Sequence, residues 1–122
     1  MALIYAVEDD KNIRKFIQTI LEANDYDVIT TETGKEAYSL ITSRCPDVVI
    51  LDLGLPDMDG MKILKEVRAS SNMPIIVISA RSEDSDKIEA LDSGADDYIT
   101  KPFSVEELLA RIRVTQRRLA II

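Results

Sequence analysis

The sequence predicts a doubly wound α/β fold, in which a parallel sheet of five strands is covered by helices on both faces. Five short apolar runs rich in β-branched residues alternate strictly with five segments of helical periodicity, which is typical of consecutive β–α units. The runs at 48–51 and 75–78 are apolar without alternation, as expected of strands that are buried on both faces.

The strands are expected at 3–7, 27–31, 48–51, 75–79 and 98–100, and the helices at 11–23, 34–43, 60–68, 83–93 and 104–119. Pro46 and Pro74 precede the third and fourth strands, where a missing amide hydrogen is tolerated. Gly94 follows the fourth helix, at the place where a left-handed residue commonly ends a helix.

Two helices begin with a capping box, formed by Thr33 with Glu36 and by Ser104 with Glu107. The first and last helices have apolar stripes at helical spacing. The stripes consist of Ile13, Phe16, Ile17, Ile20 and Leu21 in the first helix, and of Val105, Leu108, Leu109 and Ile112 in the last.

Composition excludes several classes of function. The 122 residues fit one domain and contain no histidine and one cysteine, Cys45. A catalytic histidine, a His-ligated metal, a four-cysteine zinc site and an intramolecular disulfide are therefore excluded. The net charge of −7 argues against direct nucleic-acid binding by this chain, because phosphate backbones require a basic surface.

The acidic excess lies in the first half of the chain. Residues 1–60 hold 12 acidic and 5 basic side chains, whereas residues 61–122 hold 10 of each. We therefore expect a site in the first half that uses the carboxylates.

No membrane contact is predicted. No apolar run is long enough to span a membrane, and no signal peptide is visible at the N-terminus. Together with the lone cysteine, these features predict a cytoplasmic location.

Polar side chains follow four of the five strands: Glu8, Asp9 and Asp10 after the first, Asp52 at the end of the third, Ser79 at the end of the fourth and Lys101 after the fifth. Ligands of open α/β sheets bind beyond the carboxyl ends of the strands, so these groups should converge. Converging carboxylates favour Mg²⁺. An aspartate beside this cation, a hydroxyl and a lysine can carry out phosphoryl transfer to a carboxylate, with Asp52 as the nucleophile. Asp57 and Asp59 are expected to belong to the same acidic pocket.

Each of these residues also has a structural explanation. An acidic triplet after a strand is often only a helix cap. Asp52 alone could be a turn residue, Ser79 a satisfied strand-end hydroxyl and Lys101 a solvated surface lysine. Their occurrence together at successive strand ends favours the functional interpretation.

Four motifs carry a resemblance to a known family: VEDD at 7–10, LDLGLPDMDG at 51–60, ISA at 78–80 and GADDYITKPF at 94–103. Over essentially its whole length, 1–122, the chain resembles the receiver domain of bacterial two-component response regulators, in particular the OmpR/PhoB type and its Kdp potassium-uptake group. The resemblance implies a flavodoxin-like (βα)₅ sandwich with strand order 2-1-3-4-5. It also implies that the C-terminal DNA-binding domain of a longer parent is absent from this chain.

By this resemblance, Asp52 accepts a phosphoryl group from a sensor histidine kinase, and the domain is a signalling switch rather than a turnover enzyme. Mg²⁺, for which Mn²⁺ can substitute, would be held by Asp9, Asp52 and the backbone carbonyl of Gly54, with Glu8 acting through water. The phosphate would contact Leu53, Ser79, Ala80 and Lys101. Ser79 and Tyr98 would be the switch residues, a cis Lys101–Pro102 bond would aim the lysine inward, and Asp10 could cap the first helix.

The resemblance further implies a homodimer that forms on phosphorylation through the fourth helix, fifth strand and fifth helix. Three pairs of opposite charge would join two copies: Lys87 with Glu107, Asp92 with Arg113, and Asp97 with Arg111. An apolar patch of Ile88, Leu91, Ala95 and Leu109 would lie between them. A solvated face with local ion pairs is the alternative interpretation.

Three other functions share part of this pattern. A haloacid-dehalogenase-type phosphatase needs a second aspartate two residues after the nucleophile, where this chain has Gly54. A flavodoxin-like flavin binder needs a phosphate loop where VEDD stands. A degenerate receiver that serves only for interaction is disfavoured by the complete set of Asp9, Asp52, Ser79 and Lys101.

Overall fold

The computed structural model describes residues 2–121. Five parallel strands form one sheet in the order β2-β1-β3-β4-β5. The strands are β1 (Leu3–Val7), β2 (Asp27–Thr31), β3 (Val48–Asp52), β4 (Ile75–Ser79) and β5 (Asp97–Thr100). The helices are α1 (Lys11–Ala23), α2 (Gly34–Arg44), α3 (Gly60–Arg68), α4 (Asp84–Asp92) and α5 (Val105–Ile121). The predicted fold class and strand order are thus confirmed.

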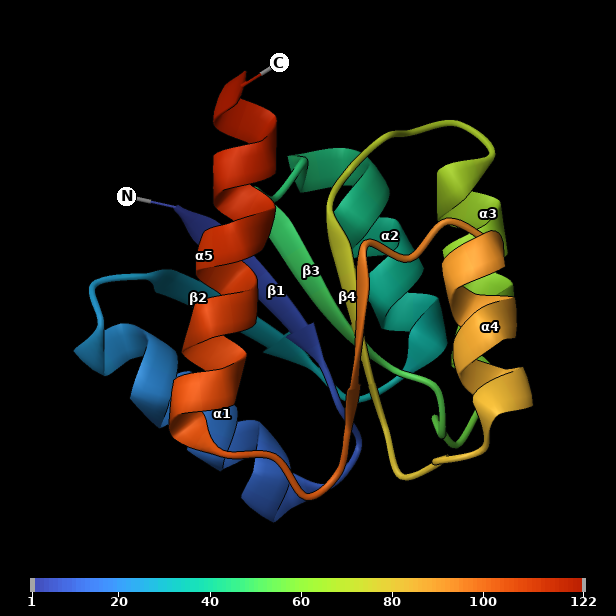
Figure 1. Cartoon of the computed structure of the whole chain (residues 1–122), viewed down its shortest axis with the longest axis horizontal. Helices are drawn as coiled ribbons and strands as arrows, with labels where there is room; N and C mark the ends of the chain where they lie inside the picture. Colours follow the sequence, from blue (N-terminus) through green and yellow to red (C-terminus); the bar gives the residue numbers. More distant parts are fainter. Residues whose placement is uncertain (1, 122) are drawn as a thin grey trace.

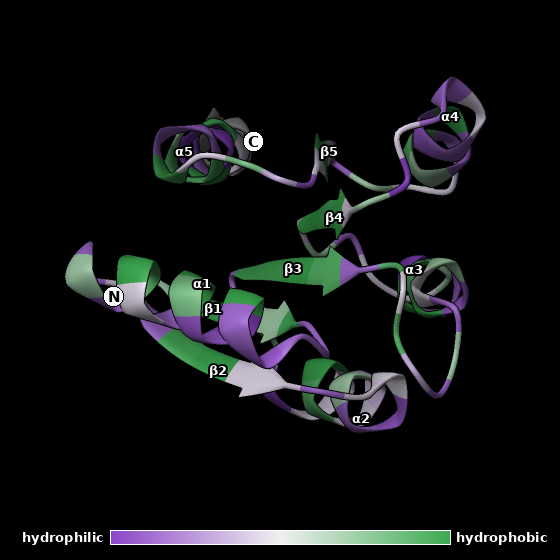
Figure 2. Cartoon of the chain, turned by 90° about the horizontal axis from the view of Figure 1, so that it is seen from below, coloured by the Kyte–Doolittle hydropathy of each residue, from purple (hydrophilic) through white to green (hydrophobic). Residues whose placement is uncertain are grey.

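The helices form two layers around the sheet. Helices α1 and α5 cover one face, and α2, α3 and α4 cover the other (Figure 1). In Figure 2 the strands are mostly green, that is, apolar, while purple segments appear on the helices and in the loops. This layering buries β3 and β4 completely, as their uninterrupted apolar runs predicted.

Two apolar clusters make up the core, one on each side of the sheet. The first joins the sheet to α2, α3 and α4 and includes Tyr5, Leu51, Leu64 and Ala90. The second joins it to α1 and α5 through Ile17 and Leu108. Because helices and apolar side chains cover both faces of the sheet, a ligand can bind only where the strands end.

The strand order determines at which end of the strands a ligand can bind. From β1 the chain turns to α1 on one face, and from the adjacent β3 it turns to α3 on the other face. A crevice opens at such a switch point, beyond the carboxyl ends of the strands. The acidic loops after β1 and β3 flank this crevice.

Helix starts follow the sequence signals closely. Asp10 accepts hydrogen bonds from the amides of Asn12 and Ile13 and so caps α1. Thr33 caps α2 through the amide of Glu36, and the Ser104 hydroxyl accepts from the amide of Glu107 at the start of α5. Past α4, Gly94 has φ +112°, the left-handed conformation that glycine adopts at no steric cost.

Two strand boundaries differ by one residue from the prediction, because register extends the strands. Asp52 still pairs with Ile78, and Asp97 already pairs with Ile76. Asp52 is therefore the last residue of β3 rather than the first residue of the following loop.

The edge of the sheet opposite the crevice is held by Arg68, the last residue of α3. Its guanidinium donates to the carbonyls of Gly94 (2.9 Å) and Ser71 (2.9 Å) and to Asp96 Oδ2 (3.2 Å). The same Asp96 oxygen accepts from the amide of Ile75 at 2.8 Å. We call this group the Arg68 clasp; it ties the carboxyl ends of α3 and α4 to the start of β4.

Within residues 2–121, no helix is both long and apolar enough to cross a lipid bilayer.

Candidate phosphoryl-transfer site

The side chains at the carboxyl ends of β1, β3, β4 and β5 come together around one pocket, as the sequence predicted. The pocket has a volume of about 350 Å³. It is lined by Asp9, Asp10, Ile13, Asp52, Gly54, Ser79, Ala80, Arg81 and Lys101. The lining thus includes carboxylates, a hydroxyl and two cationic groups.

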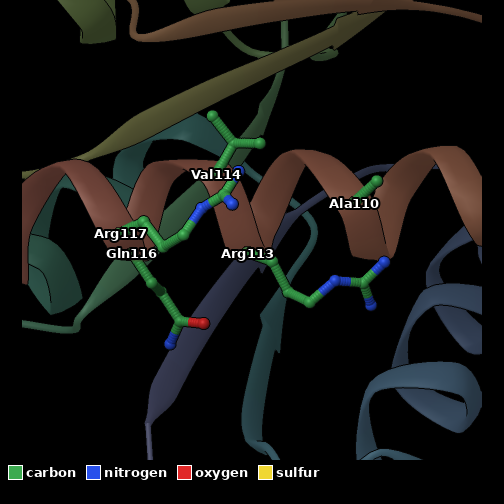
Figure 3. A pocket seen from close by; sticks show the side chains of 5 residues that line it. All are labelled: Ala110, Arg113, Val114, Gln116 and Arg117. Atoms are coloured by element: carbon green, nitrogen blue, oxygen red, sulfur yellow. The ribbon is translucent and has the colours of Figure 1, made fainter.

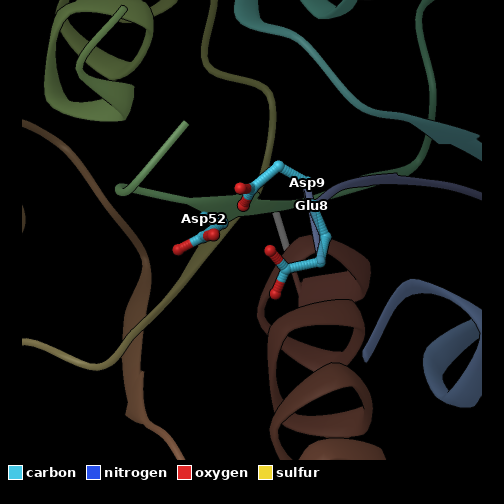
Figure 4. A group of neighbouring side chains, drawn as sticks. All are labelled: Glu8, Asp9 and Asp52. Atoms are coloured by element: carbon cyan, nitrogen blue, oxygen red, sulfur yellow. The ribbon is translucent and has the colours of Figure 1, made fainter. Parts of the chain in front are cut away.

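Three carboxylates form an acidic cluster in and beside this pocket. Glu8, Asp9 and Asp52 each offer one oxygen, and these atoms lie within 4.8 Å of one another. Figure 4 shows the three side chains meeting between the end of β1 and the end of β3. Carboxylate oxygens at this separation fit a hard divalent cation such as Mg²⁺ and repel one another without a positive charge between them.

Lys101 is the internal cation of the site. Its ammonium lies 2.6 Å from Glu8 Oε1 and 3.4 Å from Asp52 Oδ2. The Lys101–Pro102 peptide is cis, as expected. The lysine is half-buried, and so it can neutralise charge at Asp52 with little screening by water.

Two buried carboxylates, Glu8 and Asp52, lie beside a single positive charge, that of Lys101. Burial and the neighbouring Asp52 raise the pKa of Glu8 from 4.5 to about 8. Burial also opposes ionisation of Asp52, but hydrogen bonds from Glu8 and the Gly54 amide, together with Lys101, lower its pKa below the usual range. For Lys101, burial favours the neutral form, yet the two carboxylates outweigh it and raise the pKa. Without a metal ion, one proton therefore remains on the Glu8 side of the pair at neutral pH.

This shared proton predicts an unusual pH dependence for the metal-free protein. Because the folded pKa of Glu8, about 8, exceeds the ordinary 4.5, the folded state retains a proton that the unfolded state has lost. The free energy of unfolding should then fall as pH rises from 5 to 8, by roughly 2–4 kcal/mol at about 1.4 kcal/mol per pKa unit. Urea unfolding in EDTA at several pH values measures this. Glu8→Gln is the matched control and should remove most of the slope. A wild-type stability that rises over this interval would contradict the prediction.

Ser79 and Tyr98 are both bound to the backbone of Arg81. The buried Ser79 hydroxyl accepts from the Arg81 amide at 3.0 Å, and the Tyr98 hydroxyl donates to the Arg81 carbonyl at 2.7 Å. The Arg81 side chain lies 3.7 Å from Asp59. Residue 81 thus connects the predicted switch hydroxyl to the predicted switch aromatic.

Three acidic residues of the first half are helix caps instead of members of the acidic cluster. Asp10 caps α1, which was one of the two roles considered for it. The expectation for Asp57 and Asp59 is corrected: Asp57 accepts from the amides of Gly34 and Lys35 at the start of α2, and Asp59 caps α3 through Met61. Amide hydrogens at a helix start also favour a carboxylate, and composition alone cannot separate a capping carboxylate from a metal ligand.

The residues expected at the dimer face lie on α4, β5 and α5, except Ala95, which lies in the loop between α4 and β5, and their exposures differ. Ile88 and Leu91 are 57% and 46% exposed, whereas Ala95 is 8% exposed and packs in the core. Leu109 packs partly against the cluster under α1 and α5. Ile88 and Leu91 therefore supply most of the apolar surface.

One expected intermolecular pair is already made within the chain. Arg111 lies 3.4 Å from Asp97 and 3.7 Å from Glu107. The distances place all three on one charged strip between β5 and α5. A dimer would have to exchange this internal pair for one between copies.

A second hollow lies on α5, away from the acidic cluster. Figure 3 shows Arg113 and Gln116 extending to one side of the helix. The lining consists of Ala110, Arg113, Val114, Gln116 and Arg117. With two guanidinium groups and no carboxylate, this hollow cannot bind a cation.

Two features of the site were not foreseen. Arg14 on α1 donates hydrogen bonds to the carbonyls of Glu8 and Asp9, and Phe16, taken as a core position of α1, is 44% exposed. Phe16 and Phe103 have ring centroids 6.3 Å apart. With Asn12, Ile13, Ala80, Lys101 and Pro102 they line an apolar cavity of about 610 Å³ beside the acidic pocket.

The chain matches the family described as the response regulator receiver domain over residues 4–113. It is 50% identical over 118 residues to the KDP operon transcriptional regulatory protein KdpE of Escherichia coli, and 48% identical over 118 residues to KdpE of Mycobacterium tuberculosis. Each alignment covers 97% of this chain and 52% of the relative. The chain thus spans about half the length of these curated relatives.

Solved structures agree with this relationship. The receiver domain of Francisella response regulator 1452 superposes with a TM-score of 0.93 at 40% identity, covering 98% of this chain and 99% of that one. The BeF₃-activated N-terminal receiver domain of Klebsiella pneumoniae RstA superposes with a TM-score of 0.90 at 36% identity, covering 94% and 98%.

Proposed function

Because the chain belongs to the response regulator receiver domain family, we propose that it is a switch in which Asp52 accepts a phosphoryl group from a sensor histidine kinase. One observation carries this proposal. The Asp52 carboxylate lies at the crevice edge with Lys101 3.4 Å away and with Glu8 and Asp9 in the same cluster. A nucleophilic carboxylate, a cation site and an ammonium are what phosphoryl transfer to aspartate needs.

In the proposed transfer, one bond to phosphorus forms and one breaks. A carboxylate oxygen of Asp52 bonds to phosphorus as the bond from phosphorus to the donor histidine nitrogen breaks, and the imidazole keeps the electron pair. Lys101 neutralises charge on the transferred group, and the lowered pKa of Asp52 keeps the nucleophile ionised. Mg²⁺ or Mn²⁺, held by Asp9, Asp52 and the Gly54 carbonyl with Glu8 through water, would supply further positive charge.

Phosphorylation would then act through Ser79 and Tyr98. A phosphoryl group adds roughly −1.5 to −2 charges and three acceptor oxygens. Ser79 accepts from the Arg81 amide and has its own hydroxyl hydrogen to donate to one of these oxygens, and the carbonyl of the same Arg81 accepts from Tyr98. The amides of Leu53 and Ala80 are further candidate donors to the phosphate.

The first test is phosphorylation with acetyl phosphate, a donor that needs no second protein. A phosphoryl mass increment should appear with Mg²⁺ and be absent in EDTA. Removal of the ion leaves the carboxylates of the cluster without positive charge apart from Lys101. If the wild-type protein forms no adduct with Mg²⁺, the proposal fails. Rapid sustained hydrolysis of many phosphate esters would favour a phosphatase instead.

The apolar cavity between Phe16 and Phe103 offers a contact surface for the kinase. It adjoins the pocket and shares Ile13, Ala80 and Lys101 with it, so a protein that brings a phosphohistidine to Asp52 would lie against it. Phe16→Ala should therefore slow transfer from a phosphorylated kinase by about tenfold or more. Transfer from acetyl phosphate should be unchanged. Tyr38→Ala, at an aromatic residue that is 37% exposed on α2, is the control. Equal slowing with both donors would contradict a contact role.

The exposed Ile88 and Leu91 support dimerisation on phosphorylation, with Lys87–Glu107, Asp92–Arg113 and Asp97–Arg111 as pairs between copies. Addition of beryllofluoride, a phosphate mimic, should shift the monomer–dimer equilibrium toward dimer in analytical ultracentrifugation. Ile88→Asp should prevent that shift, because it places a charge within an apolar contact. An equilibrium that beryllofluoride leaves unchanged would count against the dimer.

For the longer protein we propose control of transcription. The named relatives are transcriptional regulators of about twice this length. DNA would be bound by a further domain in the cytoplasm, while this acidic chain itself binds neither DNA nor membrane. The domain would catalyse its own phosphorylation and dephosphorylation without turning over a separate substrate.

A further inference from the structure

Arg14 lies near the start of α1 and reaches back to the acidic loop that precedes the helix. Its Nη1 donates to the carbonyl of Glu8 at 3.0 Å and to that of Asp9 at 3.2 Å. The Arg14 side chain is only 17% exposed, and its Nη2 lies 3.9 Å from the exposed Glu32. The guanidinium is therefore committed mainly to the two backbone carbonyls.

These two carbonyls belong to the peptide groups on either side of the Asp9 α-carbon. The Asp9 side chain is exposed and has no hydrogen bond to any other described residue, so its direction depends on its backbone. One planar guanidinium that holds both flanking peptide groups restrains the direction of the Asp9 Cα–Cβ bond. Glu8 is held additionally through its amide, which donates to Thr31 at 3.0 Å.

We propose that Arg14 is a positioning residue for the cation site, and that its two hydrogen bonds keep Asp9 aimed at Asp52 before the metal arrives. The proposal rests on the metal-dependent phosphorylation of Asp52 proposed above. The geometry and the charge of Arg14 have opposite effects on the affinity of the site for a cation. Orientation of Asp9 favours cation binding, whereas a positive charge close to the cluster repels a cation. Both carbonyl hydrogen bonds come from one nitrogen, Nη1, so a lysine has enough donor hydrogens to replace them. Its ammonium sits on a flexible four-carbon chain, however, and would hold the two carbonyls less rigidly than the planar guanidinium does.

The test compares wild type with Arg14→Lys and Arg14→Met, and uses Lys15→Met as the control. Lys15 is exposed on the same helix, and its replacement removes the same charge. Three quantities are measured: the Mg²⁺ dissociation constant by calorimetry, the rate of phosphorylation by acetyl phosphate at saturating Mg²⁺, and exchange of the Asp10 amide hydrogen in EDTA. The Asp10 amide donates to Glu8 Oε2 at 3.3 Å and so reports on loop order without metal.

We expect both Arg14 variants to raise the Mg²⁺ dissociation constant by about 10-fold to 100-fold, the usual effect of removing a partner that orients a metal ligand. The rate at saturating Mg²⁺ should stay close to wild type, and Asp10 exchange should accelerate. A merely structural role would change thermal stability without this split between affinity and rate.

Three results would overturn the inference. Tighter Mg²⁺ binding by Arg14→Met would show that charge dominates. Wild-type affinity in both variants would show that Asp9 is held by other means, and equal weakening in Lys15→Met would show a general charge effect. If wild type itself binds no Mg²⁺ and forms no adduct, the proposed function fails with it. If the wild type is phosphorylated and the Arg14 variants bind Mg²⁺ like the wild type, only the role of Arg14 is refuted and the proposed function stands.

Discussion

Asp52→Asn should form no phosphoryl adduct with either acetyl phosphate or a phosphorylated kinase. The amide is isosteric with the carboxylate but is not a nucleophile at neutral pH, so the reaction is lost while the pocket keeps its shape. The loss should be complete within detection, because the raised pKa of Glu8, about 8, leaves it protonated at neutral pH, and because the exposed Asp9 forms no ion pair with a lysine among the described residues. Intact-protein mass spectrometry after incubation with Mg²⁺ measures the adduct.

Asp57→Asn is the matched control for this substitution. Asp57 lies in the loop that follows Asp52 and accepts from two amides of α2, a role that an asparagine oxygen can fill in part. It should be phosphorylated like wild type. A full adduct on Asp52→Asn would place the acceptor elsewhere, and loss of the adduct in both variants would point to damage to the loop rather than to the nucleophile.

Gly60→Ala should be the most damaging small substitution in the chain. A Cβ at Gly60 would lie 2.3 Å from the Asp52 carbonyl oxygen and 2.7 Å from the Leu53 α-carbon. Both are backbone atoms of the end of β3, so no side chain can move aside. We expect a loss of about 3 kcal/mol or more in the free energy of unfolding, at the upper end of the range for overpacking, and weaker Mg²⁺ binding because Asp52 is displaced.

Gly54→Ala provides the comparison within the same loop. The nearest atom to its Cβ would be Asp52 Oδ1 at 4.0 Å, an ordinary contact, and the backbone carbonyl proposed for the metal is kept. Its stability should stay within about 0.5 kcal/mol of wild type, as is usual for surface substitutions. Urea unfolding of both variants measures the difference. Equal stabilities would show that the start of α3 can shift away from β3 without cost.

Much of this site was predictable because parallel strands end at the same edge of a sheet. Once β1, β3, β4 and β5 were recognised from their apolar runs, Glu8, Asp52, Ser79 and Lys101 had to lie near one another. The elements themselves were clear because apolar periodicity and caps such as Thr33 and Ser104 agree along the chain.

Other features depend on distances that no local pattern contains. Asp57 caps a helix that begins 23 residues earlier, which makes its carboxylate indistinguishable in sequence from a metal ligand. The shared proton of Glu8 follows from complete burial beside Asp52, and burial of a polar residue cannot be deduced from its type. Arg14 resembles any charged residue on a helix surface until the direction of its guanidinium is known.

The Arg68 clasp has a mechanical consequence for the whole domain. It pins the carboxyl end of α4 at Gly94 and Asp96 through one guanidinium with three acceptors. At the other end of α4, Glu83 precedes the helix without a side-chain cap. The preceding loop is held through Arg81, by hydrogen bonds with Ser79 and Tyr98 and by the ion pair with Asp59. The helix is thus held at its C-terminal end by the clasp and along its length by the buried Ala90 and the Lys65–Glu89 ion pair, while its first turn has the fewest side-chain contacts of this kind. If the proposed switch at Ser79 operates, we therefore expect the first turn of α4 to respond to it more than the last turn, where the clasp holds Gly94 and Asp96.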